Sequence, residues 1–80
     1  MANTEEVLRK ICDKLADGAL PIEPPLHTWG TRGDGQTCGV CDEEIRPGVP
    51  AIDAESADGK DRLYHPLCYM HLANERRERG

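Results

Sequence analysis

Four side chains that bind soft metals fall in two short pairs. Cys38 and Cys41 form a CxxC motif, and His65 and Cys68 form an HxxC motif after residues 42–64. Two thiolates separated by two residues reach one ion because a tight turn brings their sulfurs together, and Gly39 suits that turn. Residues three apart on a helix share a face. The two pairs therefore predict one metal site with three sulfur ligands and one imidazole ligand.

This ligand set is typical of zinc. Three thiolates and one imidazole in a closed tetrahedral shell form a common structural zinc site. Iron would prefer four thiolates, which would require Cys12 as well. A structural zinc contributes roughly 10–16 kcal/mol of apparent binding free energy, comparable with the ~5–15 kcal/mol stability of a whole domain. We expect one structural Zn2+ per chain, and unfolding of the metal-binding module when the metal is removed.

A second histidine competes for the fourth ligand position. Cys68 and His71 also form a CxxH pair that would share one helix face. His65 is preferred because it lies at the expected start of the helix, beside the expected hairpin, whereas His71 lies a turn further along. His71 stays open as the alternative. His27 is expected outside the site, or as a residue that orients a ligand.

Strand and helix signals follow the CxxC motif. Pro47-Gly48 predicts a turn, and residues 49–54 read as a strand with Val49 and Ile52 as its apolar members. Asp58-Gly59 is a hairpin signature, so residues 62–64 are expected to return as the second strand. Ile45 is expected to seal the far side of the CxxC turn.

A helix is predicted over residues 66–77 or slightly beyond, because Pro66 suits the first helical position. Its expected apolar side consists of Leu67, Met70, Leu72 and Ala73. Arg76, Arg77 and Arg79 are interleaved with Glu75 and Glu78, which favours a solvated helix face.

The first part of the chain predicts another helix, over residues 3–17. Asn3 is a candidate N-cap and Gly18 a natural stop. One apolar stripe contains Val7, Leu8, Ile11, Cys12 and Leu15, and the residues expected to face away are Arg9, Lys10, Asp13 and Lys14. The stripe is expected to pack on the metal module or on a second copy of the chain, so a homodimer through this helix is open. Cys12 is interpreted as a small buried hydrophobe.

Prolines and glycines dominate the segment between the helix and the CxxC motif. Prolines at 21, 24 and 25 predict a stiff, extended connector whose apolar residues, Leu20, Ile22 and Leu26, lie over the core. Residues 29–35 are expected to form turns rather than regular structure and to lead Trp29 into the core. A phosphate-binding loop is excluded, because no strand is expected before this stretch and no helix after it.

The composition predicts one small domain with a thin core. The 80 residues include no Phe, one Trp and two Tyr, and 31% are charged. Chains of this length bury little surface and often need a metal or a disulfide. We expect a small α+β fold made of an amphipathic N-terminal helix (residues 1–19), a Pro/Gly-rich connector (20–37) and a zinc module (38–80).

The charge balance limits the partners. A formal net charge of -5 disfavours general nucleic-acid binding and anionic membrane surfaces. The N-terminal stretch is charged and amphipathic, and no apolar run approaches the length of a membrane span. We expect a cytoplasmic protein, where a CxxC motif indicates metal binding or redox chemistry rather than structural disulfides, and a protein partner.

Residues 64–69, Tyr-His-Pro-Leu-Cys-Tyr, together with the CxxC motif and the expected hairpin, resemble a treble-clef zinc finger and the close of the first zinc module of LIM domains. The resemblance covers residues 38 to about 72, and no second set of ligands follows. Residues 29–68 also resemble small uncharacterised bacterial proteins with a Trp-Gly, glycine-rich lead before CxxC and HxxC. These resemblances imply a single-zinc module in a free-standing bacterial protein, and they imply no activity.

Three function classes follow from these features. The first is a non-enzymatic interaction module with structural zinc, since four protein ligands close the shell that a catalytic zinc would leave open. The second is a nucleic-acid or transcription-associated finger that uses Arg76, Arg77 and Arg79. The third is a redox switch in which Cys38 and Cys41 are oxidised and release the metal.

Overall fold

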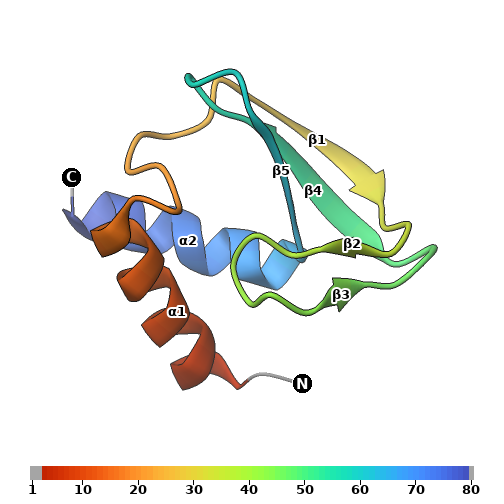
Figure 1. Cartoon of the computed structure of the whole chain (residues 1–80), viewed down its shortest axis with the longest axis horizontal. Helices are drawn as coiled ribbons and strands as arrows, with labels where there is room; N and C mark the ends of the chain where they lie inside the picture. The colour runs from red at the N-terminus through yellow and green to blue at the C-terminus, as the bar shows by residue number, and fades with distance from the viewer. Residues whose placement is uncertain (1–2, 80) are drawn as a thin grey trace.

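The computed structural model describes residues 3–79 and has the predicted α+β architecture. Figure 1 shows the helices packed against each other, with a twisted sheet that extends away from them. The elements in chain order are α1 (Thr4–Asp17), β1 (His27–Arg32), β2 (Gln36–Thr37), β3 (Glu44–Ile45), β4 (Pro50–Glu55), β5 (Asp61–Tyr64) and α2 (Pro66–Arg79). The division of the chain at residues 19 and 37 stays a prediction.

The N-terminal helix forms where its caps predict it. Asn3 accepts a hydrogen bond from the Glu6 N–H at 2.8 Å, and Gly18 ends the helix in the left-handed region with φ 85°. The apolar stripe of α1 is buried at Val7, Ile11 and Leu15, and the helix packs against α2 (Figure 1). The homodimer through this helix stays a prediction.

A three-stranded antiparallel sheet has the order β1-β4-β5. The predicted β4–β5 hairpin is confirmed, with Gly59 at φ 83° in its turn. The buried residues of β4 are Ala51 and Ala54, whereas the predicted Val49 precedes the strand and Ile52 is only half-buried. The two alanines lie on opposite faces of the sheet, because they are three residues apart in a strand.

The prediction of irregular structure over residues 29–35 is wrong for its first half, because residues 27–32 form β1. Pairing with β4 satisfies the backbone hydrogen-bonding groups of these residues. The free energy of this long-range pairing exceeds the entropy cost of fixing the flexible backbone of Gly30. The prediction that Trp29 enters the core is also wrong: its exposed fraction is 48%, because β1 is an edge strand that nothing covers. A glycine is required at Gly33, where an added Cβ would lie 2.3 Å from Ile45 Cγ2.

The connector and α2 each bury a different set of residues from the one expected. Leu20 is buried as predicted, but Ile22 and Leu26 are 62% exposed. The inner face of α2 consists of Cys68, Leu72 and Arg76, which are four residues apart, and Leu67 and Met70 face solvent. This rotation of the helix brings the Cys68 sulfur close to the other two cysteines of the cluster. The predicted apolar side of α2 is therefore only partly right.

Arg76 does not lie on a solvated face, which corrects the prediction for this arginine. It is buried, and its Nε donates to the Pro21 carbonyl at 3.1 Å. Its charge also interacts with the buried Tyr64. Burial lowers the pKa of Arg76 from its ordinary value, without removing its charge at neutral pH. The guanidinium thus ties α2 to the connector.

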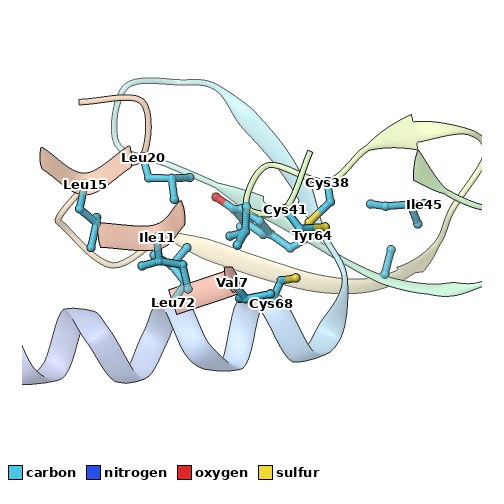
Figure 2. Close-up of a cluster of buried hydrophobic side chains, with 13 residues drawn as sticks. Val7, Ile11, Leu15, Leu20, Cys38, Cys41, Ile45, Tyr64, Cys68 and Leu72 are labelled. Atoms are coloured by element: carbon cyan, nitrogen blue, oxygen red, sulfur yellow. The ribbon is translucent and has the colours of Figure 1, made fainter. Parts of the chain in front are cut away.

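The core runs through the middle of the molecule and includes the cysteines. Figure 2 shows the Cys38, Cys41 and Cys68 side chains between Ile45 and the apolar residues of α1. Ile45 is fully buried, as predicted. Tyr64 is the largest fully buried side chain. Because few large apolar residues contribute, the three sulfurs occupy a substantial part of this interior.

Candidate metal centre

The CxxC motif lies in a loop closed by a short hairpin. We call residues 36–45 the knuckle: β2 pairs antiparallel with β3, and the loop between them carries both cysteines. The Cys38 N–H donates to the Glu43 carbonyl at 2.9 Å, and the Asp42 N–H donates to the Cys38 carbonyl at 3.1 Å. Asp42 turns the chain with φ 66°. These bonds hold both thiols on the inner side of the turn.

The second pair is delivered by the junction between β5 and α2. His65 follows the last residue of β5, and its carbonyl accepts from the Tyr69 N–H at 2.9 Å, in the first turn of the helix. Cys68 points inward from that same turn and is buried. The knuckle is fastened to β5 by a bond from Gly39 N–H to the Leu63 carbonyl, at 2.8 Å.

Close packing around Tyr64 explains why a glycine follows Cys38. A Cβ added to Gly39 would lie 2.9 Å from Tyr64 Cε1, closer than Cβ atoms approach other heavy atoms in proteins. The absence of a side chain lets the knuckle lie directly on the buried tyrosine ring. Gly39 therefore serves the docking of the knuckle as well as its turn.

The four predicted ligand side chains converge on one point. The donor atoms of Cys38, Cys41, His65 and Cys68 all lie within 4.8 Å of one another. Cys41 Sγ is 3.4 Å from His65 Nδ1, and the His65 N–H donates to Cys38 Sγ at 3.5 Å. The three cysteines are buried, and His65 is half-buried. No other such group of three or more His, Cys, Asp or Glu residues occurs within residues 3–79.

This geometry fits a tetrahedral metal ion. Zn–S bonds of about 2.3 Å place sulfur ligands about 3.8 Å apart, so the donor atoms need to move by about 1 Å or less. None of the three cysteines forms a disulfide. The cluster could therefore hold a metal ion, and its sulfur-rich donor set suits zinc.

The three thiols also change one another's pKa values. A hydrogen bond from the Cys68 thiol, reinforced by backbone N–H groups, lowers the pKa of Cys38 to about 4. The same hydrogen bond raises the pKa of Cys68, and burial raises the pKa of Cys41. One thiolate is thus stabilised by its neighbours, whereas three thiolates at this spacing repel one another unless a cation lies between them.

No family model matches this chain. Comparison with curated proteins and with solved structures finds no match either. The assignment of this centre therefore depends on its own geometry.

Two lysines of α1 contribute to the site, and sequence reasoning missed them. Lys10 Nζ donates to the Cys41 carbonyl at 2.8 Å, and Lys14 Nζ donates to the Gly39 carbonyl at 3.0 Å. Lys14 also forms an ion pair with Asp42 at 2.6 Å. The expectation that both lysines face away from the module is wrong. Long side chains at the border of an apolar stripe can bend toward a neighbouring element, and only their i, i+4 spacing hinted at this.

The remaining histidines and Cys12 lie outside the cluster. His71 is half-buried and lines a cavity of about 530 Å³ that also borders Cys41, His65 and Cys68. His27 lies on β1, with its ring 5.9 Å from that of Trp29. Cys12 is half-buried on α1.

Neither helix in the described part of the chain is long and apolar enough to cross a membrane.

Proposed function

We propose that this protein is a non-enzymatic module with one structural Zn2+, held by Cys38, Cys41, His65 and Cys68, and that its cellular role is to bind another protein. The observation that carries the zinc assignment is the convergence of four donor atoms within 4.8 Å in a largely buried site. Four protein ligands fill a tetrahedral shell and leave no position for a substrate, which supports a structural rather than a catalytic metal.

The order of the elements supports a treble-clef-like arrangement. A knuckle supplies the first two ligands, a β-hairpin follows, and the first turn of α2 supplies the last ligand. This is the order that the resemblance to treble-clef and LIM zinc modules implies. The β1 strand and α1 are additions that pack around it.

Protein binding is supported by the apolar side chains at the surface. Within residues 3–79, five large hydrophobic residues are exposed: Ile22, Leu26, Trp29, Leu67 and Met70. Exposed aromatic and methionine side chains are typical of protein interfaces. The nucleic-acid alternative is disfavoured because Arg76, one of the arginines it would use, is buried. The formal net charge of -5 also disfavours binding to a polyanion.

A zinc–thiolate redox switch is the second candidate, favoured by the mutual proximity of three sulfurs. A peroxide would oxidise two thiolates to a disulfide, with the peroxide reduced to water or an alcohol and Zn2+ released. Mild peroxide treatment should then release zinc and form a disulfide that a thiol reductant reverses. Retention of the metal under those conditions counts against this candidate.

Metal analysis of the purified protein tests the zinc assignment. We expect one zinc per chain in the wild type, loss of that zinc in His65→Ala, and retention in His71→Ala, because only His65 belongs to the donor cluster. Both histidines border the same cavity, which makes His71→Ala the matched control. Retention of zinc in His65→Ala, or its loss in His71→Ala, would reverse the assignment of the fourth ligand.

A further inference from the structure

β1 is an edge strand whose outer side has no partner within residues 3–79. The sheet order is β1-β4-β5, so β1 and β5 are the two edges. The edge of β5 is occupied, because Leu63 accepts a hydrogen bond from the knuckle at Gly39. All six residues of β1 are exposed, and Figure 1 shows the strand facing away from both helices.

The strand register shows which backbone groups are free. Gly33 N–H donates to the Val49 carbonyl at 2.7 Å, and antiparallel pairs alternate between bonded and non-bonded positions. The residues of β1 that bond to β4 are therefore His27, Trp29 and Thr31, opposite Glu55, Asp53 and Ala51. The N–H and C=O groups of Thr28, Gly30 and Arg32 point away from β4, which leaves a row of alternating donors and acceptors.

β1 contains no proline and no lysine, two residues that often protect an exposed edge against added strands. Proteins block exposed edges with proline, lysine, bulges or covering segments. The only fixed charge in β1 is Arg32, at its end, and a Cβ placed on Gly30 would meet nothing within 4 Å. From these observations we infer that the free edge of β1 binds an extended polypeptide segment that carries basic side chains. This inference rests on the protein-binding part of the proposed function.

The charge of the adjoining sheet face specifies the basic side chains. Register places His27, Glu55 and Asp61 in one row and Trp29, Asp53 and Leu63 in the next, on the same face of the sheet. Asp53 Oδ1 is buried and has no hydrogen-bond partner among residues 3–79. None of the three carboxylates has an ion-pair partner among the described residues.

A lysine or arginine on an added strand fits this face. The new strand would lie about 4.8 Å beyond β1, from where a long side chain can extend past Trp29 toward the β4 carboxylates, Asp53 and Glu55. The indole, 48% exposed, offers its ring to a cation, and Asp53 offers an unpaired oxygen. Main-chain bonds to Thr28, Gly30 and Arg32 would supply the remaining contacts, as in other cases of strand addition.

A second copy of this chain fits the same edge poorly. Each copy has a formal net charge of -5, so two copies repel each other. In an antiparallel β1–β1 pair, the other copy would bring His27, Trp29 and Thr31 to the acidic face, and Arg32 would lie on the opposite face. No lysine or arginine of β1 would then meet Asp53. The charge pattern therefore favours a different, basic segment.

A peptide-binding experiment tests this inference. The probe is an eight-residue peptide of alternating valine and lysine, labelled with fluorescein, and its acidic counterpart has glutamate in place of lysine. Binding to the zinc-loaded full chain is followed by fluorescence anisotropy and by amide chemical shifts. We expect the lysine peptide to bind, to shift the amides of Thr28, Gly30 and Arg32, and to weaken as salt increases. The acidic peptide should not bind.

Variants at Gly30 isolate the role of the edge. Gly30→Pro removes one outward N–H and should weaken lysine-peptide binding by about tenfold or more, because one main-chain hydrogen bond is lost and the edge is blocked. Gly30→Ala keeps the N–H, its added Cβ meets nothing within 4 Å, and it should bind like the wild type. Zinc content and melting temperature are measured for each variant. If Gly30→Pro loses its zinc, Thr28→Pro, whose N–H also points outward, replaces it.

The outcomes separate this inference from the zinc assignment. Absence of lysine-peptide binding by a zinc-loaded wild type overturns the docking site and leaves the metal centre intact. Equal binding by Gly30→Pro and Gly30→Ala, or shifts confined to α2, places the peptide elsewhere and also overturns it. Concentration-dependent dimerisation that Gly30→Pro abolishes would show a second copy at this edge, against the inference. A wild type without metal would refute the zinc module instead.

Discussion

Gly30 and Gly33 lie in the same glycine-rich stretch, but only Gly33 occupies a position with no room for a side chain. A Cβ on Gly30 would meet open space. A Cβ on Gly33 would lie 2.3 Å from Ile45 Cγ2 and 2.5 Å from the Arg46 carbonyl oxygen. Gly33 therefore lets the segment after β1 lie directly against the end of β3. The glycine-rich sequence alone does not distinguish the two positions.

Gly33→Ala should destabilise the protein by about 1–3 kcal/mol, because the added methyl group forces Ile45 and the backbone behind it to shift. Gly30→Ala is the matched control, with an expected change within about 0.5 kcal/mol, as is usual at exposed sites. Urea denaturation in the presence of excess zinc measures both. Equal stability of the two variants would show that the segment around Gly33 can accommodate a methyl group without cost.

At the scale of elements, α1 packs against the core and is hydrogen-bonded to the knuckle. Its apolar stripe packs into the core, and its lysines hold two carbonyls of the CxxC loop from outside. The helix is thus coupled to the metal centre by two kinds of contact. Substitutions in α1 that remove these contacts should therefore change how tightly the cluster holds a metal ion.

Lys14→Met keeps much of the side-chain length but removes the bonds to Gly39 and Asp42. We expect a loss of about 1–2 kcal/mol in stability, since hydrogen bonds to charged groups contribute about 1.5–3 kcal/mol and these are partly solvated. Zinc should also pass faster to a chromophoric chelator. The matched control is Arg9→Met, on the exposed side of the same helix. Unchanged zinc transfer in Lys14→Met would contradict the coupling of α1 to the metal.

At the scale of the whole molecule, the metal centre lies where most elements meet. The knuckle, the end of β5 and the start of α2 supply its side chains, and α1 closes over it. Three of the buried core residues are its cysteines. A metal ion bound in this cluster would make folding and metal binding interdependent.

Removal of zinc by a strong chelator should therefore unfold both helices, not only the knuckle. We expect the helical circular dichroism signal at 222 nm to fall and the cooperative thermal transition to disappear, with recovery when zinc is added back. Cys12→Ala is the control and should respond like the wild type, because Cys12 lies outside the cluster. A chelated protein with an unchanged thermal transition would show that the core suffices without metal.

Much of the local structure could be predicted from the sequence. The caps of α1, the turn at Gly59 and the start of α2 at Pro66 all depend on short-range backbone preferences, and the structure has each of them. The faces of the elements were harder to predict. The inner side of α2 contains Arg76 rather than Met70, because the position of Cys68 and the reach of a long side chain to Pro21 decide its rotation.

The sequence by itself determined which side chains could hold a metal, because the spacing of Cys38 from Cys41 and of His65 from Cys68 is a local property of a turn and a helix. Only the tertiary structure decided what surrounds them. The pairing of β1 with β4, the exposure of Trp29 and the bonds of the two lysines to the knuckle depend on residues far apart in the chain. Such contacts depend on the competition between burial and backbone pairing in the whole fold, which short-range spacing does not encode.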